Sequence, residues 1–107
     1  SITHLSISGV FNQPVDNLPS SLKCLDLSGR FNQKVDHLPE SLKYLEFGHS
    51  FEQSVDNLPN SLTDLKLGYF FNLPILVFPT SLKRIVVPSE YSYHIPDYIE
   101  IVKYFWY

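Results

Sequence analysis

The chain has little of several residue types that mark particular classes of protein. Its 107 residues include one cysteine, Cys24, and no methionine. A single cysteine cannot form an internal disulfide, which excludes a disulfide-stabilised secreted scaffold. The apolar runs are far shorter than the roughly 20 residues that a membrane-spanning helix needs, and no secretory signal pattern opens the sequence. We therefore expect a protein of a reducing compartment, the cytoplasm, with no membrane partner.

The chain also has no large excess of positive or negative charge. Eight lysines and arginines oppose eleven aspartates and glutamates, for a net charge of −3. This balance is too weak and too mixed to favour nucleic acid or an anionic membrane as a partner. Hydrophobic residues make up 44% of the chain and charged residues 18%, a composition typical of a folded protein of one domain.

A strict internal repeat organises what is present. Its most regular columns are phenylalanine at 11, 31, 51 and 71, proline at 19, 39, 59 and 79, serine at 21, 41, 61 and 81, and leucine at 22, 42, 62 and 82. Regular recurrence without insertions predicts one structural unit copied four times and stacked.

Each copy predicts one short strand and an irregular return. In the second copy the apolar residues Leu25 and Leu27 alternate with polar ones, which favours a strand over residues 23–27. Ser28 and Gly29 favour a turn after it, and a leucine before Pro39 disfavours a helix in the return. No apolar set recurs at the 3.6-residue spacing of a helix. The fold class predicted is a mainly β solenoid of 20-residue coils, with one parallel sheet on its concave face and a phenylalanine column in its core.

The two ends of the chain depart from the repeat. We expect a single domain over residues 1–107, with regular repeats in 1–87 and a degenerate, aromatic capping repeat in 88–107 that contains Tyr98, Phe105 and Trp106. A constant repeat length would place Val102, Phe105 and Tyr107 in register with Leu82, Ile85 and Val87, and Tyr91 with Phe71. Alternatively, Pro96-Asp97 begins a short terminal helix. The first coil starts at its strand, so we expect a longer parent chain or a second subunit over that edge.

The pattern Leu22-x-x-Leu25-x-Leu27 resembles that of leucine-rich repeats. The string Phe11-Asn-Gln-Pro-Val15, followed by Asp16-Asn-Leu-Pro-Ser-Ser-Leu22, resembles the FNIP repeats of social amoebae and of giant DNA viruses of amoebae. This resemblance covers residues 1 to about 88. It implies a protein-interaction module, located in the host cytoplasm if the chain is viral. In viral members the repeats often follow an F-box, which implies a ubiquitin-ligase adaptor whose repeats select the target.

Some positions depart from these patterns. Glu52 stands where the other copies have asparagine, and Lys34 and Ser54 stand where they have proline. The asparagine that closes the turn of a leucine-rich repeat is missing, so the nearby Asn12 and its equivalents are expected to close it. The short leucine-rich repeat of bacterial effectors is an alternative family, since it shares the Leu-Pro-x-Ser-Leu string.

The outward positions of the strands are the candidate binding residues. Unlike the inward columns they differ in every copy, as a surface that reads a specific partner requires. The predicted partner-binding residues are His4, Ser6, Cys24, Asp26, Tyr44, Glu46, Asp64, Lys66 and Arg84. The turns that follow the strands form the next candidate surface, the loop edge, with Arg30, His49, Tyr69 and Phe70.

Neither catalysis nor metal binding is predicted. His4, Cys24 and Asp26 suggest a cysteine nucleophile, but an open sheet offers no oxyanion hole and no water-excluding pocket. The stacked Asp16, Asp36 and Asp56 suggest a cation site, but bonds from each carboxylate to backbone amides of its own turn explain them better. The four histidines sit at unrelated repeat positions. We therefore predict no enzyme activity, no cofactor and no metal.

Two functions of different kinds remain open. The first is recognition of a protein through the concave face. The second is self-assembly, as a homodimer formed through the open N-terminal edge.

Overall fold

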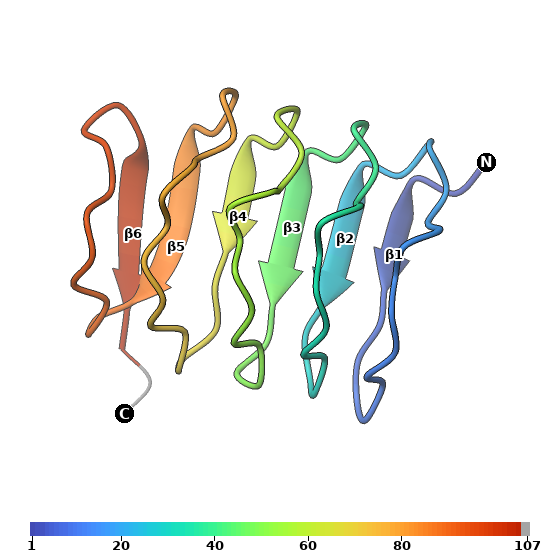
Figure 1. Ribbon diagram of the computed structural model, residues 1–107, viewed down its shortest axis with the longest axis horizontal. Helices are drawn as coiled ribbons and strands as arrows, with labels where there is room; N and C mark the ends of the chain where they lie inside the picture. Colours follow the sequence, from blue (N-terminus) through green and yellow to red (C-terminus); the bar gives the residue numbers. More distant parts are fainter. Residues whose placement is uncertain (106–107) are drawn as a thin grey trace.

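The computed structural model describes residues 1–105 and confirms the parallel β-solenoid. Six strands form one sheet in chain order (Figure 1). They are β1 (His4–Ser6), β2 (Cys24–Leu27), β3 (Tyr44–Phe47), β4 (Asp64–Lys66), β5 (Arg84–Pro88) and β6 (Glu100–Tyr104). The return segments cross one face of this sheet, and β1 and β6 lie at opposite ends of the row of strands. No helix of the described residues is long and apolar enough to cross a membrane.

The first five strands pair in the register that a constant repeat length predicts. Leu5 lies opposite Leu25, Leu25 opposite Leu45, Leu45 opposite Leu65 and Leu65 opposite Ile85. Because each of these coils has the same length, equivalent residues of successive coils stack into columns.

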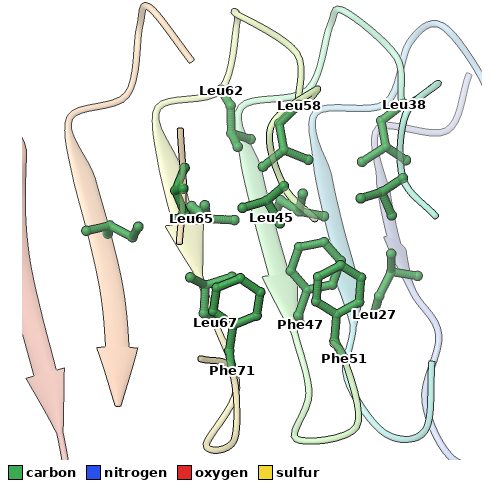
Figure 2. Close-up of a cluster of buried hydrophobic side chains, with 14 of the residues drawn as sticks. Leu27, Leu38, Leu45, Phe47, Phe51, Leu58, Leu62, Leu65, Leu67 and Phe71 are labelled. Carbon is green, nitrogen blue, oxygen red and sulfur yellow. The ribbon is translucent and has the colours of Figure 1, made fainter. Parts of the chain in front are cut away.

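The core lies between the sheet and the returns. Within a strand, buried and partly exposed residues alternate, as in β2, where Leu25 and Leu27 are buried. The returns contribute the phenylalanine column, in which Phe31, Phe51 and Phe71 are about 1% exposed. Figure 2 shows Phe51 and Phe71 of this column beside Phe47, whose ring centroid is 3.7 Å from that of Phe51. The predicted column of aromatic rings is confirmed.

The recurring serines link one coil to the previous one. The Ser41 hydroxyl donates a hydrogen bond of 2.6 Å to the carbonyl of Leu22, and the Ser61 hydroxyl donates one of 2.7 Å to that of Leu42. The proline two residues before each serine accepts from the leucine that follows it, as in the 3.2 Å bond from Leu42 N to the carbonyl of Pro39. The Leu-Pro-x-Ser-Leu string thus forms a turn whose serine also hydrogen-bonds to the previous coil.

The asparagines also link coils, and the expectation that they close their own turns is wrong. Asn12 Oδ1 accepts from the backbone N–H of Asn32 at 2.8 Å and from Gln33 Nε2 at 3.1 Å. Asn32 Oδ1 accepts in the same way from the N–H of Glu52, at 2.9 Å, and from Gln53. In these two coils, the asparagine that follows the phenylalanine therefore satisfies a donor of the next coil.

Glycine allows the coils to approach closely after the strands. Gly29 has a φ of +91°, and a Cβ at this position would lie 2.6 Å from the carbonyl oxygen of Gly9. A Cβ at Gly48 would lie 2.5 Å from Gly29 N. Backbone packs directly on backbone here, which no larger residue permits without displacing a coil.

The last coil is shorter than predicted. β6 pairs with β5 so that Ile85 lies opposite Ile101 rather than opposite Phe105. The expected alignment of Val102 with Leu82 and of Phe105 with Ile85 is therefore wrong, and Tyr107 lies outside the described residues. The aromatic column does continue as predicted, because the Tyr91 ring stacks on Phe71 with a centroid distance of 6.1 Å.

Most of the shortening occurs in the return. Pro79 follows the buried Ile75 by four positions, whereas Pro96 follows the buried Ile95 by one, so three positions are missing. Pro96 then accepts a bond of 3.1 Å from Ile99 N, as Pro79 accepts from Leu82 N. Residues 97 and 98 form a turn, so the alternative of a helix that begins at Pro96 is also wrong.

Within residues 1–105, two of the aromatic residues expected to close the C-terminal edge are exposed. Tyr98 is 70% exposed and Phe105 62% exposed, while Trp106 lies outside the described residues. Lys103 lies opposite Val87, at a position where the earlier coils hold apolar core residues. A lysine at this place discourages another strand from adding to β6.

Candidate functional site

The structure brings the predicted binding residues together on the sheet face, by which we mean the side of the sheet turned away from the core. They lie in two rows that run across the strands. One row is His4, Cys24, Tyr44, Asp64 and Arg84; the other is Ser6, Asp26, Glu46, Lys66 and Val86. All of them are exposed or half-buried.

The centre of the sheet face is a connected polar cluster. The Tyr44 hydroxyl donates a hydrogen bond of 2.6 Å to Glu46 Oε1, and Lys66 Nζ lies 3.5 Å from Glu46 Oε2. Burial raises the pKa of Tyr44, as do its bond to Glu46 and the nearby carboxylates Asp26 and Asp64. Three carboxylates thus lie around one phenol, which keeps that phenol protonated.

Local hydrogen bonds fix the side chains at the margins of the cluster. Asp26 Oδ1 accepts from the N–H of Ser28 at 2.9 Å, in the turn after its own strand. The Thr63 hydroxyl donates to Asp64 Oδ1 at 2.9 Å. Such bonds reduce the conformational freedom that these side chains would lose on binding a partner.

A hollow of about 330 Å³ opens where the sheet face meets the turns that follow the strands. The sheet-face residues Glu46, Lys66 and Val86 line it on one side, and the column of Gly29, Gly48 and Gly68 contributes backbone. The remaining lining comes from Ser28, Phe47, His49, Tyr69 and Tyr104. The hollow therefore joins the two surfaces that the sequence offered as alternatives, the sheet face and the loop edge.

Tyr104 of β6 forms a fixed wall of this hollow. Its hydroxyl donates a hydrogen bond of 2.7 Å to the carbonyl of Leu67, which follows β4, and its ring centroid lies 5.3 Å from that of Tyr69. Burial raises the pKa of Tyr104 to about 12, with smaller contributions from Tyr69 and Glu46. The Tyr104 side chain is therefore preorganised at this position.

Sequence reasoning missed Tyr104. A constant repeat length would put it opposite Arg84, whereas the short last coil puts it opposite Pro88. The sequence contains a signal for three of the four residues by which the register shifts. The spacing from Pro96 to Ile99 repeats that from Pro79 to Leu82, and it places Ile99 where a full repeat would place Val102.

Two of the four loop-edge residues contribute to the lining of the hollow. His49 and Tyr69 line it. Phe70 meets His49 edge-on, with ring centroids 6.5 Å apart. Arg30 is exposed, and its backbone N–H donates to the carbonyl of Gly9 at 3.0 Å.

The aspartates of the returns bond to the next coil, so the expectation that each serves its own turn is wrong. Asp16 Oδ1 lies 3.6 Å from His37 Nδ1, and Asp36 Oδ1 accepts from Asn57 at 3.3 Å. Asp56 accepts from the N–H groups of Leu76, at 2.7 Å, and of Val77, at 3.2 Å. In residues 1–105 no group of three or more histidine, cysteine, aspartate or glutamate side chains is arranged to hold a metal ion.

The suggested cysteine nucleophile has neighbours but no enclosed site. His4 and Cys24 are partners in the register of β1 and β2, and His4 Nδ1 is 2.9 Å from the Thr3 hydroxyl. Cys24 is half-buried on the open sheet face. This geometry provides neither an oxyanion hole nor exclusion of water.

Known proteins resemble this chain as follows. The family model described as FNIP Repeat matches residues 11–50, 31–70 and 54–86, and no catalytic family is indicated. Among solved structures, the giant-virus (CroV) protein CroV588, described as "a novel circular LRR protein structure", is 39% identical with a TM-score of 0.81. The match covers 97% of this chain but 17% of that chain. No curated protein matches.

Proposed function

Because the chain belongs to the FNIP repeat family, we propose that it is a recognition module that binds a protein partner through its sheet face. The main support for this proposal is the difference between the inward and outward positions of the strands. Inward positions repeat the same apolar residue types from coil to coil, whereas outward positions change in every coil. Solenoids use such variable surfaces to bind other proteins.

The chemistry of the sheet face suits a protein partner. It mixes the carboxylates Asp26, Glu46 and Asp64 with the cations Lys66 and Arg84 and the phenol of Tyr44. Charges of both signs in a fixed pattern select a partner by electrostatic complementarity, and a tyrosine supplies contact area at low entropic cost. We propose no nucleic acid, membrane or cofactor as a ligand, because this face has no continuous basic stripe within residues 1–105.

A pair of matched variants tests the proposal. The sheet-face variant combines Glu46→Lys with Arg84→Glu, and the return-side variant combines Lys34→Glu with Glu52→Lys, so both keep the net charge. A true partner captured from amoebal lysate should be retained by the parent and by the return-side variant and lost by the sheet-face variant. Thermal melts check folding: the return-side changes lie at exposed positions and should cost less than about 0.5 kcal/mol, whereas Glu46→Lys also removes the contacts with Tyr44 and Lys66 and should cost about 1–2 kcal/mol. Retention by the sheet-face variant would refute the proposal.

A finer role rests on the family resemblance alone. We propose that in the cytoplasm, the host cytoplasm for a viral chain, the module selects targets for an F-box-type ubiquitin-ligase adaptor. The test is whether the full-length gene product carries an F-box and whether the captured partner is ubiquitinated in its presence. A partner whose ubiquitination is unchanged when the gene is deleted would contradict this role.

Self-assembly is the second candidate, and one observation favours it. In this chain β1 has a strand neighbour on one side only, with Ile2 55% exposed and Leu5 and Ile7 incompletely covered. An open strand edge beside apolar side chains is a template for a second copy. The same chain can use this edge for assembly and the sheet face for recognition.

A further inference from the structure

The hollow between the sheet face and the loop edge is lined by Glu46, Tyr69 and Tyr104, among others. Its volume of about 330 Å³ is at the lower end of the range for small-ligand pockets. This volume can hold one large side chain of a partner but not a whole peptide segment. Such a side chain would meet two tyrosine rings, a carboxylate and glycine backbone. The chemistry of these groups decides which side chain fits.

The aromatic walls favour a cation. Tyr69 and Tyr104 have ring centroids 5.3 Å apart and planes inclined by 53°, so two electron-rich rings border the same space. A planar guanidinium stacks on such rings and is attracted by the ring quadrupole. The bond from Tyr104 to the Leu67 carbonyl fixes one of these rings.

The charges around the hollow favour the same choice. Glu46 lines it, and its carboxylate contributes to the raised pKa of Tyr104 on one side and of Tyr44 on the other. Asp26 and Asp64 add to the effect on Tyr44, whereas the hollow itself offers one lysine, Lys66. Asp26, Glu46 and Asp64 thus outnumber the sheet-face cations Lys66 and Arg84 by one, while the lining of the hollow itself balances Glu46 with Lys66. An arginine would therefore have to take the place of Lys66 at Glu46.

Lys66 shows how a cation is held here. Its ammonium lies 3.5 Å from Glu46 Oε2, and its side chain is 41% exposed and therefore able to swing aside. A guanidinium from a partner would approach the same carboxylate and, unlike the ammonium, bond to it in two places.

We infer that this hollow accepts an arginine side chain of the protein partner, stacked on the ring of Tyr104 and paired with Glu46. The inference rests on the proposed function and gives it a specific anchor. The register shift of the last coil contributes to this site, because the shorter coil places Tyr104 at the hollow.

Nuclear magnetic resonance titration with short peptides tests the inference without the natural partner. The probes are acetyl-Gly-Arg-Gly-amide and the same peptide with the neutral isostere citrulline or with glutamate in place of arginine. The arginine peptide should shift the amide signals of Gly48, Gly68 and Tyr104, with a dissociation constant on the order of millimolar, as one side chain provides. It should bind at least about ten-fold more tightly than the citrulline peptide, because one charged pair distinguishes them.

Matched variants locate the carboxylate. Glu46→Gln, which retains an acceptor for Tyr44, should weaken the arginine peptide about ten-fold, whereas Glu40→Gln, at an exposed position in the turn before β3, should not. Equal binding of the arginine and citrulline peptides, tighter binding of the glutamate peptide, or signal shifts outside the hollow would overturn the inference. If the peptides fail but the sheet-face variant still loses its captured partner, the proposed function stands and only the arginine anchor falls.

Discussion

Phe51 is a core residue with three aromatic neighbours. It is about 1% exposed and stacks on Phe31, Phe47 and Phe71. Phe51→Ala should therefore lower the free energy of unfolding by about 3–5 kcal/mol, a large part of the roughly 5–15 kcal/mol of a small domain. A thermal melt measures this, with Val10→Ala, at a side chain 77% exposed, as the control. A Phe51→Ala melt that matches the parent would contradict the stacked column.

Tyr104 should make the stability of the fold sensitive to alkaline pH. Its pKa is raised to about 12 from an unfolded value near 10, so the folded state favours the neutral phenol. The stabilisation is fully present below about pH 10 and is lost as pH rises through about 12.

The variant Tyr104→Phe isolates this effect, since other tyrosines and lysines titrate in both proteins. Urea midpoints measured from about pH 8 to about pH 11.5 should show the advantage of the parent over Tyr104→Phe shrinking as the pH rises above about 10. An advantage that stays constant over this range would mean that the Tyr104 hydroxyl is not buried against Leu67 as described.

At the scale of the coil, polar side chains decide how neighbouring coils join. Asn32 accepts both from the backbone N–H of Glu52 and from Gln53 Nε2. Asn32→Ala should cost about 1 kcal/mol, because two donors of the third coil then lack this acceptor. Denaturant titration should show a smaller effect for Asn72→Ala, at the exposed equivalent position of the fourth coil. Equal effects would show that the asparagine contributes only within its own coil.

The strands were predictable from sequence up to β5, and the register of β6 was not. From β1 to β5, alternating apolar residues and a constant repeat length determine each strand. For the last strand, the predicted and observed partners of Ile85 are Phe105 and Ile101, an even shift that leaves every side chain on the same face. Alternation of apolar and polar residues therefore cannot distinguish the two registers. The length of the last coil decides, and the Pro96-to-Ile99 spacing reveals three of the four residues by which it is shorter. The fourth is lost between Ile99 and Ile101, where the sequence contains no signal.

At the scale of the whole molecule, the two rows of the sheet face followed directly from the strand register, whereas the hollow did not. The rows need only the constant repeat length and the alternation of a strand, both visible in the sequence. The hollow needs Tyr104 to reach the carbonyl of Leu67, a contact between distant coils that depends on the shorter last coil.

The open edge of β1 should make the isolated chain self-associate. Two copies paired edge to edge about a two-fold axis would cover Ile2 and Leu5, the simplest closed arrangement. Sedimentation velocity should show a concentration-dependent dimer that Leu5→Lys converts to monomer at some cost in stability. The control is Ile101→Lys at the opposite end, a position 43% exposed, which should leave the dimer intact. A parent chain that is monomeric at high concentration would contradict the assembly.

Recognition through the sheet face is the central claim, and the single thiol offers a direct probe of it. Cys24 lies half-buried in the first of the two rows, beside Tyr44. Its rate of maleimide labelling is measured with and without the captured partner. The control moves the thiol to the exposed return by combining Cys24→Ser with Asn17→Cys.

With the partner at about ten times its dissociation constant, the account predicts that labelling of Cys24 slows about ten-fold while labelling of the return-side thiol is unchanged. Unchanged labelling of Cys24, together with protection of the thiol at position 17, would place the partner on the returns and contradict the claim.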